Sequence, residues 1–209
     1  MPLVSVLLTT YNRENYVAES IESVLAQTWK EFELVIVDDA STDRTVEIVQ
    51  RYCVDPRVRF VRNEKNLGDY PNRNHAATLA HGEFIKYHDS DDVMYPHCLE
   101  LMVRPLIDEP RADFAVTSAS SWLGGPVPML QTPELAYCRQ FFGGFRLFSG
   151  GPATALFRKT FFESLGRFPM AFGASDYLFW IKAFAVGNAL LVPADLFWYR
   201  VHPLSLIHI

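Results

Sequence analysis

The sequence predicts an α/β fold, a three-layered α/β/α sandwich with a mostly parallel central sheet. Short runs rich in β-branched residues alternate with stretches in which apolar residues recur at helical spacing, as in βαβ units. Several of these runs are apolar almost throughout, which is typical of strands covered on both faces. The 209 residues are 49% hydrophobic, which is sufficient for one domain with a sizeable core.

The first half of the chain alternates regularly. The expected strands are residues 3–9, 32–37, 58–61 and 84–88. The expected helices are residues 17–28, 46–53 and 71–80, with Pro71 in a first turn and Gly82 placed to end the last helix. Such alternation implies a parallel sheet with right-handed crossovers. We interpret residues 1–118 as a nucleotide-binding half.

The second half is less regular. After an expected strand at residues 114–118, residues 119–150 mix Gly, Pro and aromatic residues without a clear period, so we expect this stretch to line a site. A strand at 153–157, a short helix at 159–165 and a helix from Asp176 onward are expected to follow. No linker suggests a second domain, so we treat residues 1–209 as one.

Two predicted strands run directly into groups of acidic residues. These groups are Asp89, Asp91 and Asp92 after residues 84–88, and Asp38 and Asp39 after residues 32–37. Because ligands in open α/β sheets bind at the carboxyl ends of the strands, we expect both groups to face one cleft. Clustered carboxylates need a neutralising cation, and their oxygens suit Mn²⁺ or Mg²⁺, which can hold a diphosphate. The alternative is helix capping, which explains residues 41–43 but not Asp38 and Asp39.

Composition excludes some functions and suggests a compartment. A net charge of −5 and scattered basic residues give no general attraction to nucleic acid. The three cysteines lack metal or framework spacing and are interpreted as reduced thiols of a cytosolic protein. No signal peptide and no apolar run of roughly 18 residues are visible, so no transmembrane segment is expected. We expect a cytoplasmic protein, and peripheral attachment to the inner face of the membrane stays open.

Six segments, in order and at suitable intervals, together closely resemble the family 2 glycosyltransferases of the Rossmann-like GT-A fold. They are VSVLLTTYNR (4–13), VIVDDASTD (35–43), NLG (66–68), RN (73–74), GEFI (82–85) and DSDD (89–92). The resemblance implies a nucleoside-diphosphate-sugar donor, a divalent cation as cofactor, and transfer to a carbohydrate or glycolipid acceptor in cell-surface polysaccharide or glycoconjugate synthesis. Residues 119–209 would then be the acceptor-binding half.

The resemblance also assigns roles at the donor site. The residues implied to bind the nucleotide sugar are Thr9, Thr10, Tyr11, Asn12, Asp39, Arg73, Asp89 and Ser90. Asp39 would accept a hydrogen bond from the base imide, which favours uracil or thymine. The alternative for Arg73 is a surface helix charge. Asp91 is the expected metal ligand, although a one-residue shift would give this role to Asp92, and His202 is a further candidate near the metal or diphosphate.

The implied reaction is inverting transfer, in which Asp176 removes the proton of the acceptor hydroxyl as general base. The alternative role of Asp176 is to cap the helix that it begins. Relatives often have an acidic residue where this chain has Ser175, which suggests slow turnover or an unusual acceptor. A nucleotide-binding relative without transfer activity is therefore the main rival function. A nucleotidyltransferase or a dinucleotide oxidoreductase would need glycine-rich loops that are missing after the first strand.

The acceptor side of the sequence is less informative. The aromatic residues between 119 and 150 could offer platforms to a sugar ring, belong to the core or form a homodimer surface, and the sequence leaves these alternatives open. Relatives usually continue for a helix or more beyond the last residues. Residues 204–209 also match the translation of a common sequencing adaptor, so we expect the chain to be truncated at its C-terminus.

Overall fold

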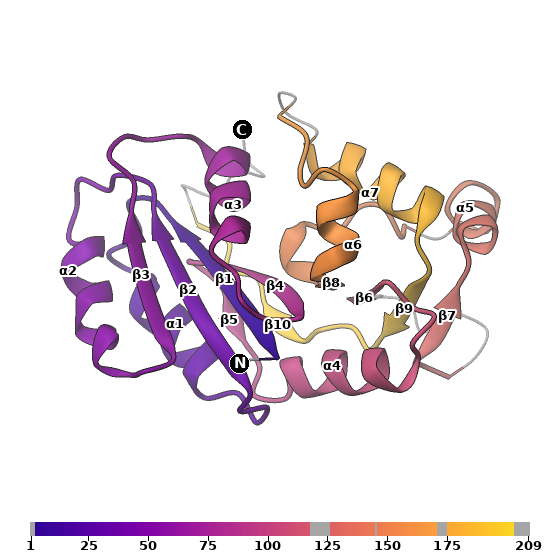
Figure 1. Ribbon diagram of the computed structural model, residues 1–209, viewed down its shortest axis with the longest axis horizontal. Helices are drawn as coiled ribbons and strands as arrows, with labels where there is room; N and C mark the ends of the chain where they lie inside the picture. The colour runs from indigo at the N-terminus through magenta and orange to yellow at the C-terminus, as the bar shows by residue number, and fades with distance from the viewer. Residues whose placement is uncertain (1–2, 118–125, 145, 171–174, 203–209) are drawn as a thin grey trace.

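The computed structural model describes residues 3–117, 126–144, 146–170 and 175–202. An eight-stranded sheet in the order β3-β2-β1-β4-β8-β6-β9-β7 runs through both halves of this part of the chain (Figure 1). Its strands are β1 (Val4–Thr10), β2 (Phe32–Asp38), β3 (Val58–Arg62), β4 (Phe84–Asp89), β6 (Phe114–Thr117), β7 (Met129–Gln131), β8 (Ala155–Arg158) and β9 (Ala189–Val192). A second, antiparallel pair joins β5 (Val93–Met94) to β10 (Phe197–Trp198).

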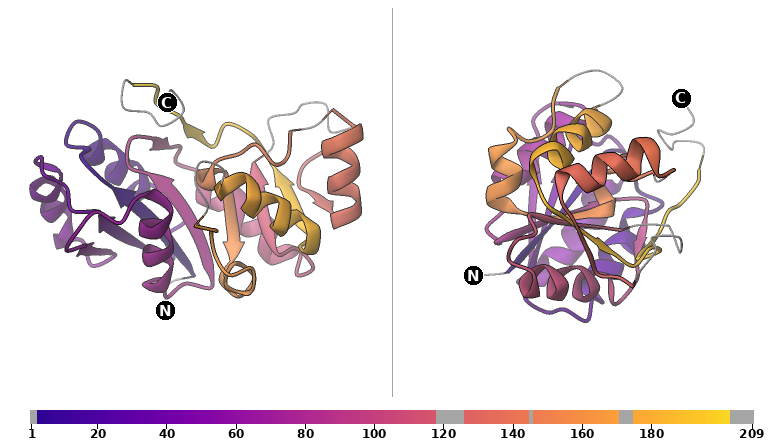
Figure 2. Two further views of the ribbon diagram at one scale, coloured as in Figure 1. Left: turned by 90° about the horizontal axis from the view of Figure 1, so that it is seen from above. Right: turned by 90° about the vertical axis from the view of Figure 1, so that its right-hand side faces the viewer.

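Helices cover both faces of the sheet, as the end-on view in Figure 2 shows. On one face, α1 (Val17–Leu25), α2 (Thr45–Gln50) and α4 (Cys98–Asp108) bury the even-numbered side chains of β1 and β2. On the other, α3 (Asp69–Thr78), α5 (Pro133–Phe142), α6 (Lys159–Ser164) and α7 (Ser175–Val186) enclose a core rich in phenylalanine. Short 3₁₀ turns, η1 (Arg51–Val54) and η2 (Pro152–Thr154), complete the elements. The predicted α/β/α sandwich is thus confirmed.

The register of the sheet brings the predicted strand ends together. The parallel strands β2, β1 and β4 are neighbours, and Thr10 pairs with Asp38 while Thr9 pairs with Asp89. Because all three strands run the same way, the loops that follow them emerge side by side at the carboxyl ends of the strands, the edge of the sheet at which the site lies. This register places the two acidic groups at the ends of β2 and β4, on either side of the end of β1.

The sheet is mixed beyond β4. The pairings of β4 with β8, β8 with β6, and β9 with β7 are antiparallel, whereas β6 and β9 pair in parallel. The regular βαβ pattern of the first half therefore stops where the sequence loses its alternation. The C-terminal segment from residue 203, and with it residues 204–209, lies outside the described residues.

Three elements, β7, α5 (Pro133–Phe142) and α4 (Cys98–Asp108), differ from the sequence expectation. Residues 129–142, expected to be irregular, contain β7 and α5. Only Ala136 of α5 is buried, and the half-buried Tyr137 packs against the core beside it. Its start is nonetheless signalled by Thr132, whose hydroxyl accepts a hydrogen bond from the Leu135 N–H. Helix α4, which contains Pro105, was also not expected.

Gly82 does not end a helix, since α3 stops at Thr78. A Cβ atom at Gly82 would lie 2.6 Å from the Ser5 backbone nitrogen and 2.8 Å from the Val4 carbonyl carbon. The glycine is therefore needed because the chain entering β4 passes directly against the backbone of β1.

Candidate active site

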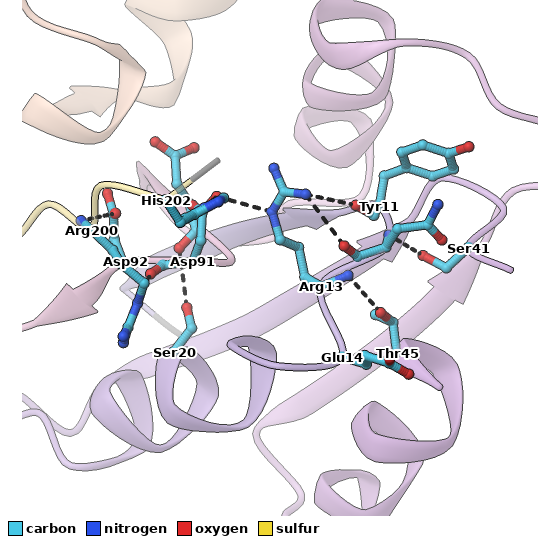
Figure 3. A network of polar contacts seen from close by, with 12 residues as sticks. Tyr11, Arg13, Glu14, Ser20, Ser41, Thr45, Asp91, Asp92, Arg200 and His202 are labelled. Carbon is cyan, nitrogen blue, oxygen red and sulfur yellow. Dashed lines mark hydrogen bonds and ion pairs between the residues drawn. The ribbon is translucent and has the colours of Figure 1, made fainter. Parts of the chain in front are cut away.

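The loops after β1 and β2 are hydrogen-bonded to each other at the edge of the site (Figure 3). The Asn12 N–H donates to the Ser41 hydroxyl at 2.9 Å, and the Thr42 N–H donates to the Asn12 side-chain oxygen at 2.9 Å. The Arg13 N–H donates to the Thr45 hydroxyl at 2.8 Å. Asn12 has a φ of 51°, a left-handed conformation that asparagine adopts more readily than most residues. Asn12, predicted to contact the donor, joins these two loops.

The other predicted residues of this segment differ in exposure. Thr9 and Thr10 are buried at the end of β1, and the Thr10 hydroxyl has no hydrogen-bond partner among the described residues. Tyr11, in contrast, is 43% exposed. An exposed ring next to the acidic strand ends can stack on a planar base.

Asp39 is buried and holds the loop after β3. Its Oδ1 accepts hydrogen bonds from the Asn63 amide at 2.7 Å and the Leu67 N–H at 2.9 Å. Its Oδ2 accepts the Gly68 N–H at 2.9 Å. The carboxylate thereby fixes the turn that leads into α3, which carries the next predicted site residue.

Arg73, on α3, bridges two carboxylates. Its guanidinium donates to Asp89 and to Asp69 at 2.7 Å each, and it is 7% exposed, so it is not a surface charge. Burial opposes ionisation, but Asp89 and Asp69 raise the pKa of Arg73 above its usual value. Burial would likewise raise the pKa of Asp89, yet Arg73 holds it below its usual range. Both groups are therefore charged, and Ser90 is buried in the turn beside them.

Asp91 receives two donors at its Oδ2, as Figure 3 shows. The Arg13 Nε and the His202 Nε2 each lie 2.9 Å from this oxygen. The His202 ring stacks on the Tyr16 ring with centroids 4.6 Å apart. The Arg200 guanidinium lies over the same Tyr16 ring, 5.2 Å from its centroid. The segment after β10 is thus hydrogen-bonded to the acidic turn at residues 89–92, and His202 and Asp91 are 111 residues apart in the sequence.

Asp92 occupies a different environment from Asp91. It is 1% exposed, its Oδ1 accepts the Arg200 N–H at 3.0 Å, and its Oδ2 has no partner among the described residues. Burial and the charge of Asp89 raise the pKa of Asp92 to about 7. Burial also lowers the pKa of His88 beneath the turn to about 3, so this imidazole is neutral.

Asp176 lies in the first turn of α7, which begins one residue earlier, at Ser175. Its backbone N–H donates to the Tyr70 hydroxyl at 3.2 Å, and its Oδ1 accepts the Tyr177 N–H at 2.7 Å. Burial and the charge of Asp176 raise the pKa of Tyr70. Because Tyr70 and Arg73 both belong to α3, this helix connects the predicted base to the acidic turn.

The side chains of Asp91 and His202 could act as ligands of a divalent cation. Asp91 supplies a carboxylate oxygen and His202 an imidazole nitrogen beside it, and both atom types would serve as ligands of Mn²⁺ or Mg²⁺. Two protein ligands with substrate phosphates and water are a common set for such ions. No group of three or more His, Cys, Asp or Glu side chains forms a metal site within the described parts of the chain.

A mixed sheet in which β2 and β4 run into acidic residues at their carboxyl ends is typical of α/β proteins of the GT-A class. The chain belongs to glycosyltransferase family 2, since the model of that family, described as "Glycosyl transferase family 2", matches residues 5–166. The predicted family is confirmed. No helix in the described ranges is both long enough and apolar enough to cross a bilayer.

Among curated relatives, poly(ribitol-phosphate) beta-N-acetylglucosaminyltransferase TarS of Staphylococcus aureus is 32% identical over 200 residues, covering 93% of this chain and 35% of TarS. Chondroitin synthase of Escherichia coli is 40% identical over 117 residues, covering 56% of this chain and 16% of the synthase. The chain thus spans about a third or less of the length of these curated relatives.

Solved structures agree with the fold. TarS 1–349 in complex with UDP-GlcNAc matches with a TM-score of 0.77 at 27% identity, over 98% of this chain and 60% of that chain. The mannosyltransferase PcManGT from Pyrobaculum calidifontis, in complex with GDP-Man and Mn²⁺, matches in fold with a TM-score of 0.70 at 24% identity, over 93% of this chain and 55% of that chain. The GT-A fold predicted from the sequence is confirmed.

Proposed function

We propose that the protein transfers a sugar from a UDP- or dTDP-linked donor to an acceptor hydroxyl with inversion at the anomeric carbon. The observation that carries this proposal is the register of β2, β1 and β4, which gathers Asp39, Asp89 and Asp91 along one edge of the sheet. A nucleotide laid along that edge meets Asp39 at one end and Asp91 at the other. Family membership and the likeness to TarS support the same reading.

The base and the ribose of the donor are bound, in this proposal, by side chains at the ends of β1, β2 and β4. Asp39 accepts the imide N–H of the base, and Tyr11 stacks on its face. Arg73 keeps Asp89 ionised, so that Asp89 can accept from a ribose hydroxyl. Thr9 and Thr10 form the buried floor at the end of β1.

Asp91 and His202 would hold the divalent cation, Mn²⁺ or Mg²⁺. Asp91 fits this role better than Asp92, because Asp92 is buried and bonded to the backbone of Arg200. When bound, the cation supplies positive charge where the departing diphosphate becomes more negative. Arg13 lies against the same Asp91 oxygen and adds a fixed positive charge beside the phosphates.

Asp176 is the proposed general base, which takes the proton of the acceptor hydroxyl as that oxygen attacks the anomeric carbon. Its backbone N–H is bonded to Tyr70 and its Oδ1 to the Tyr177 N–H, so we assign the proton transfer to its second oxygen, Oδ2. We further propose that the acceptor is a carbohydrate or glycolipid of the cell surface and that transfer takes place in the cytoplasm, at the inner face of the membrane.

Thermal unfolding of the purified protein with UDP, dTDP and other nucleoside diphosphates, each with and without Mn²⁺, tests the donor site. We expect UDP or dTDP to raise the melting temperature only with Mn²⁺, and Asp91→Asn to abolish the rise. Asp176→Asn should keep the rise but lose transfer. A rise in every variant without any transfer by the wild type would instead support the rival function, nucleotide binding without catalysis.

A further inference from the structure

The orientation of the Asn63 side chain follows from its neighbours. Asn63 is 8% exposed and follows β3, and its Nδ2 lies 2.7 Å from Asp39 Oδ1 and 2.9 Å from Asn72 Oδ1. A carboxylate accepts hydrogen bonds only, so the atom of Asn63 that faces Asp39 is the amide NH₂. The Asn63 oxygen then faces His75 Nδ1 at 2.9 Å and accepts, so His75 carries a proton on Nδ1.

This small network is closed at its other end. The Asn72 amide nitrogen donates to the Val37 carbonyl of β2 at 3.2 Å, which leaves the Asn72 oxygen for Asn63. Asn63 is therefore held by a donor on one side and an acceptor on the other, both on α3. Its NH₂ cannot turn away from Asp39 without breaking three contacts.

The network limits what else Asp39 can bind. An ionised carboxylate has about four acceptor positions, two on each oxygen. Asn63 and Leu67 use both positions of Oδ1, and Gly68 uses one of Oδ2. Counting the partners in the described parts of the chain, one acceptor position is left, on Oδ2, so Asp39 can take a single further donor.

Nucleobases differ in the number of donors they offer on this edge. Uracil and thymine present one imide N–H between two carbonyl groups. Guanine presents two adjacent donors, the ring N–H and the amino group, which pair with a carboxylate only if both oxygens are open. The same fold occurs with a UDP-linked sugar in TarS and a GDP-linked sugar in PcManGT, so the fold itself does not select the base.

We propose that Asn63 is a specificity-determining residue, which fills Asp39 Oδ1 and so makes the site accept a single-donor base and reject guanine. This inference rests on the proposed function, because it assumes that Asp39 faces the base. The guanine amino group would meet an occupied oxygen and lose its partner on binding. One unpaired buried donor should weaken binding about tenfold or more.

The sharpest test uses inosine diphosphate, which has the size and ring N–H of GDP but lacks the amino group. With Mn²⁺ present, we would titrate UDP by calorimetry and then measure its displacement by IDP and by GDP. In the wild type, IDP should displace UDP at least about tenfold more effectively than GDP. Equal displacement by the two purines, including none by either, would overturn the proposal without recourse to any variant.

Asn63→Ala should then reduce the difference between IDP and GDP toward unity, because Oδ1 regains an open acceptor position. Asn74→Ala is the matched control, since Asn74 lies on α3 but its amide bonds the Phe168 backbone, and it should leave the ratio unchanged. A ratio that is unchanged in Asn63→Ala would also contradict the proposal. If UDP itself fails to bind the wild type, the proposed function fails first, and the two failures are distinguished.

Discussion

Replacing Asp92 by asparagine should stabilise the protein at alkaline pH. Asp92 is buried, one of its oxygens has no partner among the residues that the structure describes, and burial raises the pKa of its carboxyl from 3.8 to about 7. Each pKa unit corresponds to about 1.4 kcal/mol, so ionising Asp92 costs the folded state about 4 kcal/mol at most. The side chain of the neighbouring Asp91 is 17% exposed, so solvent screens part of this cost, and we expect a gain of roughly 2–4 kcal/mol for Asp92→Asn at pH 8.

The pH dependence has a definite sign. Because the folded pKa of Asp92 lies above the unfolded one, the penalty is absent below pH 3.8, grows as the pH rises and is complete above pH 7. The advantage of Asp92→Asn over the wild type should therefore grow by up to about 1.4 kcal/mol for each pH unit between 5 and 7 and then level off. This slope does not depend on any constant cost of the buried amide.

Urea unfolding of both proteins in EDTA, from pH 5 to pH 8.5, gives the free energy of unfolding directly. Asp108→Asn, at the exposed end of α4, serves as a charge-matched control and should show no such slope. A difference between Asp92→Asn and the wild type that is flat with pH, or a less stable variant at pH 8, would show that Asp92 is paired in solution. Retained Mn²⁺-dependent UDP binding in Asp92→Asn would support Asp91 as the ligand.

Two further predictions concern the opposite end of the sheet, where β1, β2 and β4 begin. Burial works against ionisation of Glu33, but hydrogen bonds from Ser5 and Arg59 lower its pKa, so its contribution is present above pH 4.5 and is lost as the pH falls. Glu33→Gln should cost about 1–3 kcal/mol at pH 7 and less at pH 4, measured by urea unfolding; an equal cost at both pH values would argue against this network. Gly82→Ala should cost about 1–3 kcal/mol in the same assay because its Cβ meets the Ser5 backbone. Gly151→Ala should be nearly neutral, since a Cβ there meets no atom of the described residues within 4 Å.

Much of the fold could be predicted because periodicity and burial coincide in the first half of the chain. Strands β1, β2 and β4 are buried on both faces, so their apolar runs were visible directly. Helix α5 was missed because its exposed faces carry phenylalanine while only Ala136 is buried, and its periodicity therefore does not follow a core. The capping residue Thr132 was the available signal.

The partners of the acidic residues were less predictable than the residues themselves. Motif spacing pointed to Asp39 and Asp91, but nothing local reveals that Asn63 binds the first or that Arg13 binds the second. These contacts depend on how loops after different strands meet at the edge of the sheet, which a single sequence does not encode in any short pattern. The roles assigned to these residues stay predictions until ligand binding is measured.

The position of β8 has a consequence for how the chain can be divided. β8, from the second half, lies between β4 and β6, which both belong to the first half. A fragment ending at residue 118 would leave β4 with an open hydrogen-bonding edge and β6 with no neighbour. Such edges promote aggregation. The predicted boundary near residue 118 therefore does not separate two parts that could fold independently, because strands from both sides of it pair in one sheet.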